Sequence, residues 1–172
     1  MSTNLPAPEE TAAAVSRRLT ARICDEAARK EGGMSFDRFM DMALYEPGLG
    51  YYSGAGRKFG PDGDFVTAPE ISPLFSRCVA AQVAEVLDRS GGAVLEFGAG
   101  SGVLAADLLG ELESRAVLPE EYLILEVSAE LRHRQRQTLE ARVPGLIERV
   151  RWLDHLPGQP LSGVVVANEV LD

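Results

Sequence analysis

The stretch Ala93–Gly102, with the sequence AVLEFGAGSG, joins a short apolar run to three closely spaced glycines. Its first half predicts a short buried β-strand, and the helix-forming sequence VLAADLL follows directly from Val103. Glycines at such a strand-to-helix turn can adopt positive φ and let a ligand approach the backbone closely. The amide groups at the start of the helix then face whatever lies above the strand. This arrangement is typical of a nucleotide-type site.

Two details indicate which kind of nucleotide fits. A dinucleotide fold needs G-x-G-x-x-G/A, and the last small position, counted from Gly98 and Gly100, falls on the larger Val103. The third glycine comes one residue early, at Gly102. Glu96 lies inside the strand, where a carboxylate is costly unless it is paired. A ligand with an ammonium group and a sulfonium would explain this charge, whereas a pyrophosphate would not; a tight structural turn with an incidental glutamate is the alternative.

The remaining C-terminal sequence alternates predicted helices and strands. Helices are expected at 103–114 and 128–139, and strands at 122–125, 147–152 and 163–167. Such alternation favours a parallel sheet with helices on both faces and a ligand crevice at the carboxyl ends of the strands. The residues expected to line this crevice are Glu96, Glu126, Leu153, Asp154, Asn168 and Glu169. Arg132, His133, Arg134 and Arg136 are interpreted as a solvated basic face of helix 128–139.

The N-terminal half reads as helices and loops. Residues 1–10 are predicted to be disordered. A first helix is predicted at 11–30, and its apolar stripe is formed by Val15, Leu19, Ile23 and Ala27. A second helix is predicted to begin after Ser35, its cap residue. The long loop 45–69 is rich in glycine and proline, carries three tyrosines and ends in a strand-like segment, 63–67. It is interpreted as a lid or substrate loop, with a structural wrap as the equal alternative. A helix capped by Ser72 follows, with an expected buried stripe of Phe75, Cys78, Val79, Val83, Val86 and Leu87.

Composition and charge exclude several classes of function. The net charge is −9 and no basic run occurs, which argues against nucleic acid as a partner. An acidic surface suits a basic protein substrate, and the alternative is that it only keeps the protein in solution. Cys24 and Cys78 lack CxxC spacing and are expected to be small core residues in a reducing compartment. His133 and His155 have no companion ligands, so no metal site is predicted. No apolar run approaches about 18 residues, and the N-terminus resembles neither a signal nor a transit peptide.

Four motifs occur in order along the chain: YEPGLGYYS at 45–53, GDFVTAPEISPLF at 63–75, LEFGAGSG at 95–102 and VVVANEVLD at 164–172. The third resembles motif I of the class I S-adenosylmethionine (SAM) methyltransferases, and the set together resembles the MidA family. That resemblance implies a Rossmann-like α/β fold, SAM as cofactor, and methylation of a protein arginine in the eukaryotic members, which are mitochondrial assembly factors of respiratory complex I. The absence of a transit peptide favours a bacterial cytoplasmic protein, and the oligomeric state is left open.

The resemblance also implies roles for individual residues. The methionine part of SAM would lie on Gly98, Gly100 and Gly102, with its ammonium held by Glu96. Glu126 would accept from the ribose hydroxyls, and Leu153 and Asp154 would flank the adenine. Thr67, Glu70 and Ser72 either close over the cofactor or serve as helix caps. Glu169, with either Asp172 or Glu70, would hold a substrate guanidinium, and Asn168 would accept from the donor amine of either ligand.

The class I sheet has seven strands, whereas this sequence ends after the fourth. Residues 164–167 are apolar on both faces, as in an interior parallel strand, so we expect an incomplete sheet. The expected organisation is a disordered segment 1–10, a helical and loop region 11–90 that covers the site, and the first half of a SAM-binding domain at 91–172. A non-catalytic methyltransferase-like scaffold or assembly factor is the alternative function, and an NAD-dependent oxidoreductase is disfavoured by Val103 and Glu96.

Overall fold

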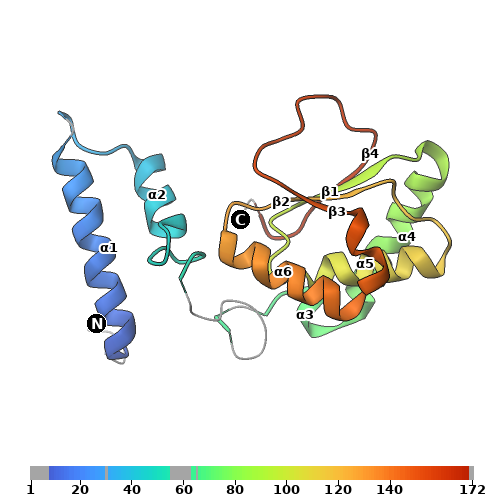
Figure 1. Ribbon diagram of the computed structural model, residues 1–172, viewed down its shortest axis with the longest axis horizontal. Coiled ribbons are helices and arrows are strands. Elements are labelled where there is room, and N and C mark those ends of the chain that lie inside the picture. Colours follow the sequence, from blue (N-terminus) through green and yellow to red (C-terminus); the bar gives the residue numbers. More distant parts are fainter. Residues whose placement is uncertain (1–7, 30, 55–62, 65, 171–172) are drawn as a thin grey trace, which may run out of the picture. The chain divides into compact units, whose positions relative to one another are not determined.

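The computed structural model describes residues 8–29, 31–54, 63–64 and 66–170. The chain separates into two compact units, residues 1–55 and 56–172 (Figure 1). The prediction of a disordered N-terminus falls largely on residues 1–7, outside the described residues, and helix α1 already begins at Glu10. None of the described helices is long and apolar enough to cross a membrane.

The first unit contains helices α1 (Glu10–Ala28) and α2 (Phe36–Tyr45), which confirms both predicted helices. Ser35 occupies the N-cap position of α2, although its side chain makes no capping hydrogen bond. Helix α1 has no fully buried residue, and Met42 is the buried residue of α2. The apolar stripe of α1 is therefore only partly covered, and polar contacts contribute to its attachment.

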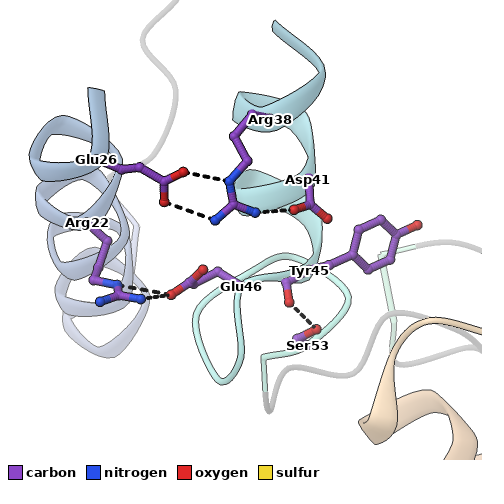
Figure 2. A network of polar contacts seen from close by, with 7 residues as sticks. All are labelled: Arg22, Glu26, Arg38, Asp41, Tyr45, Glu46 and Ser53. Carbon is purple, nitrogen blue, oxygen red and sulfur yellow. Dashed lines mark hydrogen bonds and ion pairs between the residues drawn. The ribbon is translucent and has the colours of Figure 1, made fainter. Parts of the chain in front are cut away.

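Those polar contacts are guanidinium–carboxylate pairs (Figure 2). Arg38 of α2 donates from Nε to Glu26 Oε1 at 2.7 Å and from Nη2 to Glu26 Oε2 at 2.9 Å, and it also pairs with Asp41. Arg22 donates from Nη2 to Glu46 Oε1 at 2.6 Å. The bonds from Glu26 raise the pKa of Arg38 above its ordinary range. Two forked contacts thus link α1 to α2 and to the turn that follows it.

The tyrosine-rich turn after α2 is compact. The backbone amide of Tyr52 donates to Leu44 O at 2.8 Å, and Ser53 Oγ donates to Tyr45 O at 3.1 Å. The rings of Tyr45 and Tyr52 stack at 5.7 Å, while Tyr51 meets Tyr52 edge-on at 5.0 Å. The centre of the loop predicted at 45–69 lies outside the described residues. The expected strand at its end is not formed by residues 63–64 or 66–67.

The second unit is built around a four-stranded parallel sheet in the order β3-β2-β1-β4, which confirms the α/β fold. Its strands are β1 (Ala93–Phe97), β2 (Tyr122–Leu125), β3 (Val150–Leu153) and β4 (Gly163–Ala167). Its helices are α3 (Ala68–Ile71), α4 (Pro73–Ser90), α5 (Val103–Ser114) and α6 (Ala129–Arg142), with the 3₁₀ helix η1 (Pro144–Arg149) before β3. Ser72 caps α4, since its Oγ accepts from Leu74 N at 3.2 Å.

Helices α4, α5 and α6 all contribute to one core cluster on a single face of the sheet (Figure 1). That cluster includes Val94, Tyr122 and Ile124, whereas the opposite face carries Leu95 and Leu123 in a smaller cluster without a helical residue among those described. The expectation of helices on both faces is therefore wrong for the described part. Strands β1, β2 and β3 follow one another across the sheet towards the same edge. Because each crossover between them is right-handed, the connecting helices lie on the same face.

Three local predictions are corrected. The strand expected at 147–152 begins only at Val150, because Pro144 opens a 3₁₀ helix that continues to Arg149. Cys78 and Cys24 are exposed rather than buried. Val86 of the expected α4 stripe is also exposed, and the buried face runs instead through Ser76, Ala80, Val83, Ala84 and Leu87. Cys78 lies two residues from both Ser76 and Ala80, off that face, because neighbours at this spacing point to different sides of a helix.

Candidate functional site

The carboxyl ends of the four strands lie level with one another. Strand register pairs Leu153 with Leu125, Leu125 with Phe97, and Phe97 with Ala167. The residues that come next along each strand therefore form a row at one edge of the sheet: Asp154, Glu126, Gly98 and Asn168. The structure thus brings four of the predicted site positions to the edge where ligands bind in open parallel sheets.

The glycine loop provides room for a ligand at one position and close helix packing at another. Gly98 and Gly100 both have positive φ, 58° and 54°. A Cβ placed on Gly98 would meet only Val170 Cγ2, at an ordinary van der Waals distance of 3.8 Å, so no backbone atom crowds this position. Gly102 has φ 83°, and a Cβ there would lie 2.9 Å from Gln135 Cα. Gly102 therefore allows α6 to pack directly against the loop.

Glu96 is a buried carboxyl in the centre of the sheet. It is 2% exposed, and the Tyr122 hydroxyl donates to its Oε2 at 2.8 Å. Burial raises the pKa of Glu96 to about 7, the bond from Tyr122 opposes this shift, and the nearby Glu126 carboxylate adds to it. Burial, together with Glu96, also raises the pKa of Tyr122. A cationic ligand group close to Glu96 would favour its ionised form.

Glu126, directly after β2, is held by hydrogen bonds to both carboxylate oxygens. Ser128 N donates to Oε1 at 2.9 Å and Gln135 Nε2 donates to Oε2 at 3.1 Å. The residue is 5% exposed, and burial raises the pKa of its carboxyl while the bond from Ser128 N opposes the rise. The orientation of this carboxylate is thus set by α6 and by the turn before it.

Gln135 is a site residue that sequence reasoning missed. It is fully buried, it donates from Nε2 to Gly100 O at 3.2 Å as well as to Glu126, and its Oε1 accepts from Trp152 Nε1 at 2.9 Å. The tertiary contacts therefore join the glycine loop, the end of β2 and strand β3 through one side chain. A lone glutamine in a polar helix carries no sequence signal that distinguishes it from a solvated one.

Arg132 was predicted to lie on a solvated basic face, and that prediction is wrong. Its Nε donates to Glu126 O at 2.6 Å, its Nη2 to Leu153 O at 2.7 Å and its Nη1 to Asp154 Oδ1 at 2.8 Å. The guanidinium thereby links the ends of β2 and β3, because its fork matches acceptors on two adjacent strands. Asp154 is the exposed member of this cluster, with 78% of its side chain accessible. Arg136 also contacts the sheet, with its guanidinium 4.5 Å from the centroid of the Trp152 ring.

The three site residues predicted before α4 make different contacts. Glu70 Oε1 accepts from Ser101 Oγ of the glycine loop, so α3 contacts the site directly. Ser72 caps α4, which is the alternative role considered for it. Thr67 precedes α3, and its carbonyl accepts from Glu70 N at 2.9 Å without a capping bond from its side chain.

The predicted substrate residues follow β4. Asn168 is half-buried, and Glu169 is exposed with a left-handed backbone, φ 51°. Such a conformation is uncommon for a non-glycine residue and often accompanies functional loops. Asp172, the third predicted member, lies outside the described residues.

Comparisons with known proteins agree with this geometry. Residues 78–172 match the model of a family described as S-adenosyl-L-methionine-dependent methyltransferases. Over 96% of its length the chain is 30% identical to a protein of mouse (Mus musculus), and equally to one of cattle (Bos taurus), both named "Protein arginine methyltransferase NDUFAF7, mitochondrial". The chain spans 38% of the length of each of these relatives.

Solved structures give a closer similarity. A crystal structure of a Burkholderia thailandensis protein bound to S-adenosyl-homocysteine superposes with a TM-score of 0.85 at 50% identity. A second structure from that organism gives a TM-score of 0.79 at 49% identity. Each match covers 98% of this chain, and 45% and 43% of the respective Burkholderia chains.

Proposed function

Because the chain belongs to the family of S-adenosyl-L-methionine-dependent methyltransferases, we propose that its protein transfers the methyl group of SAM to an arginine side chain of a protein substrate. The resemblance to the MidA family seen in the motifs is confirmed by the comparisons, and SAM is the family's cofactor. SAM supplies an electrophilic methyl group, and in-line transfer depends on positioning and electrostatics.

The observation that carries this proposal is the pair of buried carboxyl groups, Glu96 and Glu126, near the uncrowded backbone of Gly98. Among the described residues, Glu96 accepts from Tyr122, and Glu126 accepts from Ser128 N and Gln135 and also interacts electrostatically with Arg132; neither carboxyl has a hydrogen bond from a basic side chain. Buried carboxylates are costly without a partner. A ligand that offers an ammonium group and ribose hydroxyls supplies a further partner for each carboxyl, so the residues present fit SAM.

The roles of the neighbouring residues follow from their places in the row of strand ends. Glu96 holds the ammonium, Glu126 accepts from the ribose hydroxyls, and Gly98 allows the methionine part to lie against the backbone. Leu153 and Asp154 flank the adenine. Glu70, bound to Ser101 Oγ, supports the glycine loop, and Thr67, directly before α3, closes over the cofactor.

The acceptor is proposed to lie beside Asn168 and Glu169, directly after β4. Glu169, with Asp172, holds a guanidinium by charge-assisted bonds, and Asn168 accepts from it. Arginine as the acceptor is supported by the names of the mammalian relatives and by the net charge of −9, which favours a basic peptide. The similarity to Burkholderia chains supports a bacterial source, and the cytoplasm is proposed as the location.

The first test is calorimetric titration of the intact protein with S-adenosyl-homocysteine, with NADH as the control ligand. We expect the protein to bind S-adenosyl-homocysteine and not NADH. Glu126→Ala should bind S-adenosyl-homocysteine more weakly, with an unchanged circular dichroism spectrum. Methyl transfer is then measured with radiolabelled SAM and a hypomethylated protein extract, followed by amino-acid analysis of the labelled product.

Label in methylarginine with the wild-type protein, absent with Glu126→Ala, supports the proposal. Label in another residue would overturn arginine as the acceptor. Binding of S-adenosyl-homocysteine without any transfer would instead favour a non-catalytic scaffold, and no binding by the folded protein would overturn the cofactor assignment.

A further inference from the structure

Helix α6 contacts the candidate site through polar side chains rather than through a continuous apolar stripe. Arg132, Gln135 and Thr138 each donate to a backbone carbonyl of a segment that forms the site. Thr138 Oγ1 donates to Ser101 O at 2.7 Å, next to the Gly100 carbonyl that Gln135 contacts. Residues three apart share a helix face. This polar face of α6 therefore sets the positions of the glycine loop and of the strand ends.

We propose that Gln135 is the positioning residue for ribose recognition: its side-chain amide holds the Glu126 carboxylate and the Gly100 carbonyl in one arrangement, and Trp152 fixes that amide. The inference rests on the proposed function, because it takes Glu126 as the acceptor for the ribose hydroxyls. Gln135 contacts Glu126 and the loop backbone, and it acts on the ligand through them.

The orientation of the Gln135 amide follows from its partners. The indole N–H of Trp152 only donates, whereas the Glu126 carboxylate and the Gly100 carbonyl only accept. Oε1 must therefore face Trp152, at 2.9 Å, and Nε2 must face the two acceptors, at 3.1 and 3.2 Å. Both hydrogens of the amide have acceptors, and a flipped amide would lose all three bonds. The group is thus held in a single state.

This arrangement orients Glu126 to accept a hydrogen bond from the ribose. An ionised carboxylate has about four acceptor positions, and Ser128 N and Gln135 Nε2 bind one on each oxygen. The backbone N–H of Val127 also interacts with this carboxylate, so about one acceptor position remains for a ribose hydroxyl. The backbones of Gly102 and Gln135 are also in close contact, since a Cβ on Gly102 would lie 2.9 Å from Gln135 Cα. Movement of Gln135 would therefore disturb the carboxylate and the loop together.

The experiment compares two ligands in calorimetric titrations of the intact protein: S-adenosyl-homocysteine and its analogue without the ribose 2′-hydroxyl. In the wild-type protein, loss of a hydroxyl bound to a carboxylate is expected to weaken binding by roughly tenfold or more. Gln135→Met keeps the length of the side chain but loses both donors, so the ratio of the two affinities should fall towards one. Gln137→Met is the matched control, because Gln137 is exposed and its side-chain amide contacts His133 of the same helix.

The ratio separates positioning from a structural role, which would weaken both ligands equally. A wild-type ratio in Gln135→Met would overturn the inference even if both affinities fell. If that variant does not fold, the same ratio of affinities is measured for Trp152→Phe, which removes the donor that fixes the amide. A reduced ratio supports the inference, and an unchanged ratio overturns it. Wild-type protein that binds both ligands equally would overturn the role of Glu126 and this inference, while failure to bind either would overturn the proposed function itself.

Discussion

The buried carboxyl of Glu96 makes the stability of the second unit depend on pH. Its side chain is 2% exposed, and the Tyr122 hydroxyl donates to it at 2.8 Å. The substitution Glu96→Gln keeps the shape and the acceptor for Tyr122 but cannot ionise. The variant should therefore avoid the cost of an unpaired charge in the core while losing the partner for a ligand ammonium.

The magnitude follows from the difference between the folded and unfolded pKa values. The pKa is raised to about 7 in the folded protein from an ordinary value of 4.5. The folded state therefore binds this proton more tightly, so the contribution of Glu96 to wild-type stability is largest below pH 4.5, falls as pH rises towards 7, and is constant above. At about 1.4 kcal/mol per pKa unit the total loss is roughly 3 kcal/mol, of which about 2–3 kcal/mol develops between about pH 5 and about pH 8.

Urea unfolding at the two pH values, followed by tryptophan fluorescence, measures this loss. The chain has one tryptophan, Trp152, and it lies in β3, so the signal reports the sheet unit. Relative to wild type, Glu96→Gln should gain about 2–3 kcal/mol in stability at about pH 8 compared with about pH 5. Taking the difference between pH values removes any pH-independent effect of the new amide, and Glu113→Gln at an exposed position is the matched control.

The same variant should bind S-adenosyl-homocysteine more weakly than wild type. Equal pH dependence in the two proteins would refute the reasoning, because it would mean that Glu96 does not retain its proton on folding. A variant that gains stability and binds the ligand normally would leave the electrostatic argument intact and remove Glu96 from the ammonium site.

Two further predictions concern the contacts around the glycine loop and the strand ends. Gly102→Ala should lower the stability of the second unit by roughly 2–5 kcal/mol in urea unfolding, from positive φ and the contact with Gln135 combined. The control is Gly110→Ala in helix α5. It should be neutral or slightly stabilising, because the new Cβ would lie at an ordinary contact distance of 3.6 Å from Val143 Cγ1. Equal effects of the two substitutions on stability would contradict the packing argument. Arg132→Lys should lower the free energy of unfolding by roughly 1–3 kcal/mol, because a single ammonium cannot reach Glu126 O, Leu153 O and Asp154 together. Asp154→Ala should lower it by less than about 1 kcal/mol, because Asp154 is exposed. Thermal melts of the two variants check this order, and a larger loss in Asp154→Ala would show that the ion pair matters more than the carbonyls.

Much of the secondary structure could be predicted because its signals are local. Helix α5 and strands β2 and β4 have the bounds that the sequence predicted. Glycine before α5, and Ser72 with Pro73 before α4, act on their own backbone, so no distant partner is needed to recognise them. The start of β3 was misplaced because the apolar residue Ile147 is compatible with a strand and with a 3₁₀ turn, and Pro144 decided for the turn.

Some residues of the candidate site also have a local sequence signal, whereas others are placed there only by tertiary contacts. Glu96 was predicted from the sequence because a carboxylate within an apolar strand is costly unless a partner or a ligand binds it. Glu126 was predicted because it ends the second strand, at the edge where parallel sheets bind ligands. Tyr122, Arg132 and Gln135 were not, although each makes a hydrogen bond to one of these glutamates. Their contacts join residues between 6 and 26 positions apart only after β1, β2 and α6 have packed.

The sequence by itself therefore determined the family and the order of strands and helices along the chain, and it predicted the two carboxylates of the candidate site. The tertiary structure decided which polar side chains of α6 turn inward, and that Cys24 and Cys78 face outward. The physical reason is that a helix has the same local hydrogen bonds whichever face is buried, and α6 has too few apolar residues to indicate that face. Its orientation is set by the carbonyls and carboxylates that the folded strand ends present to it.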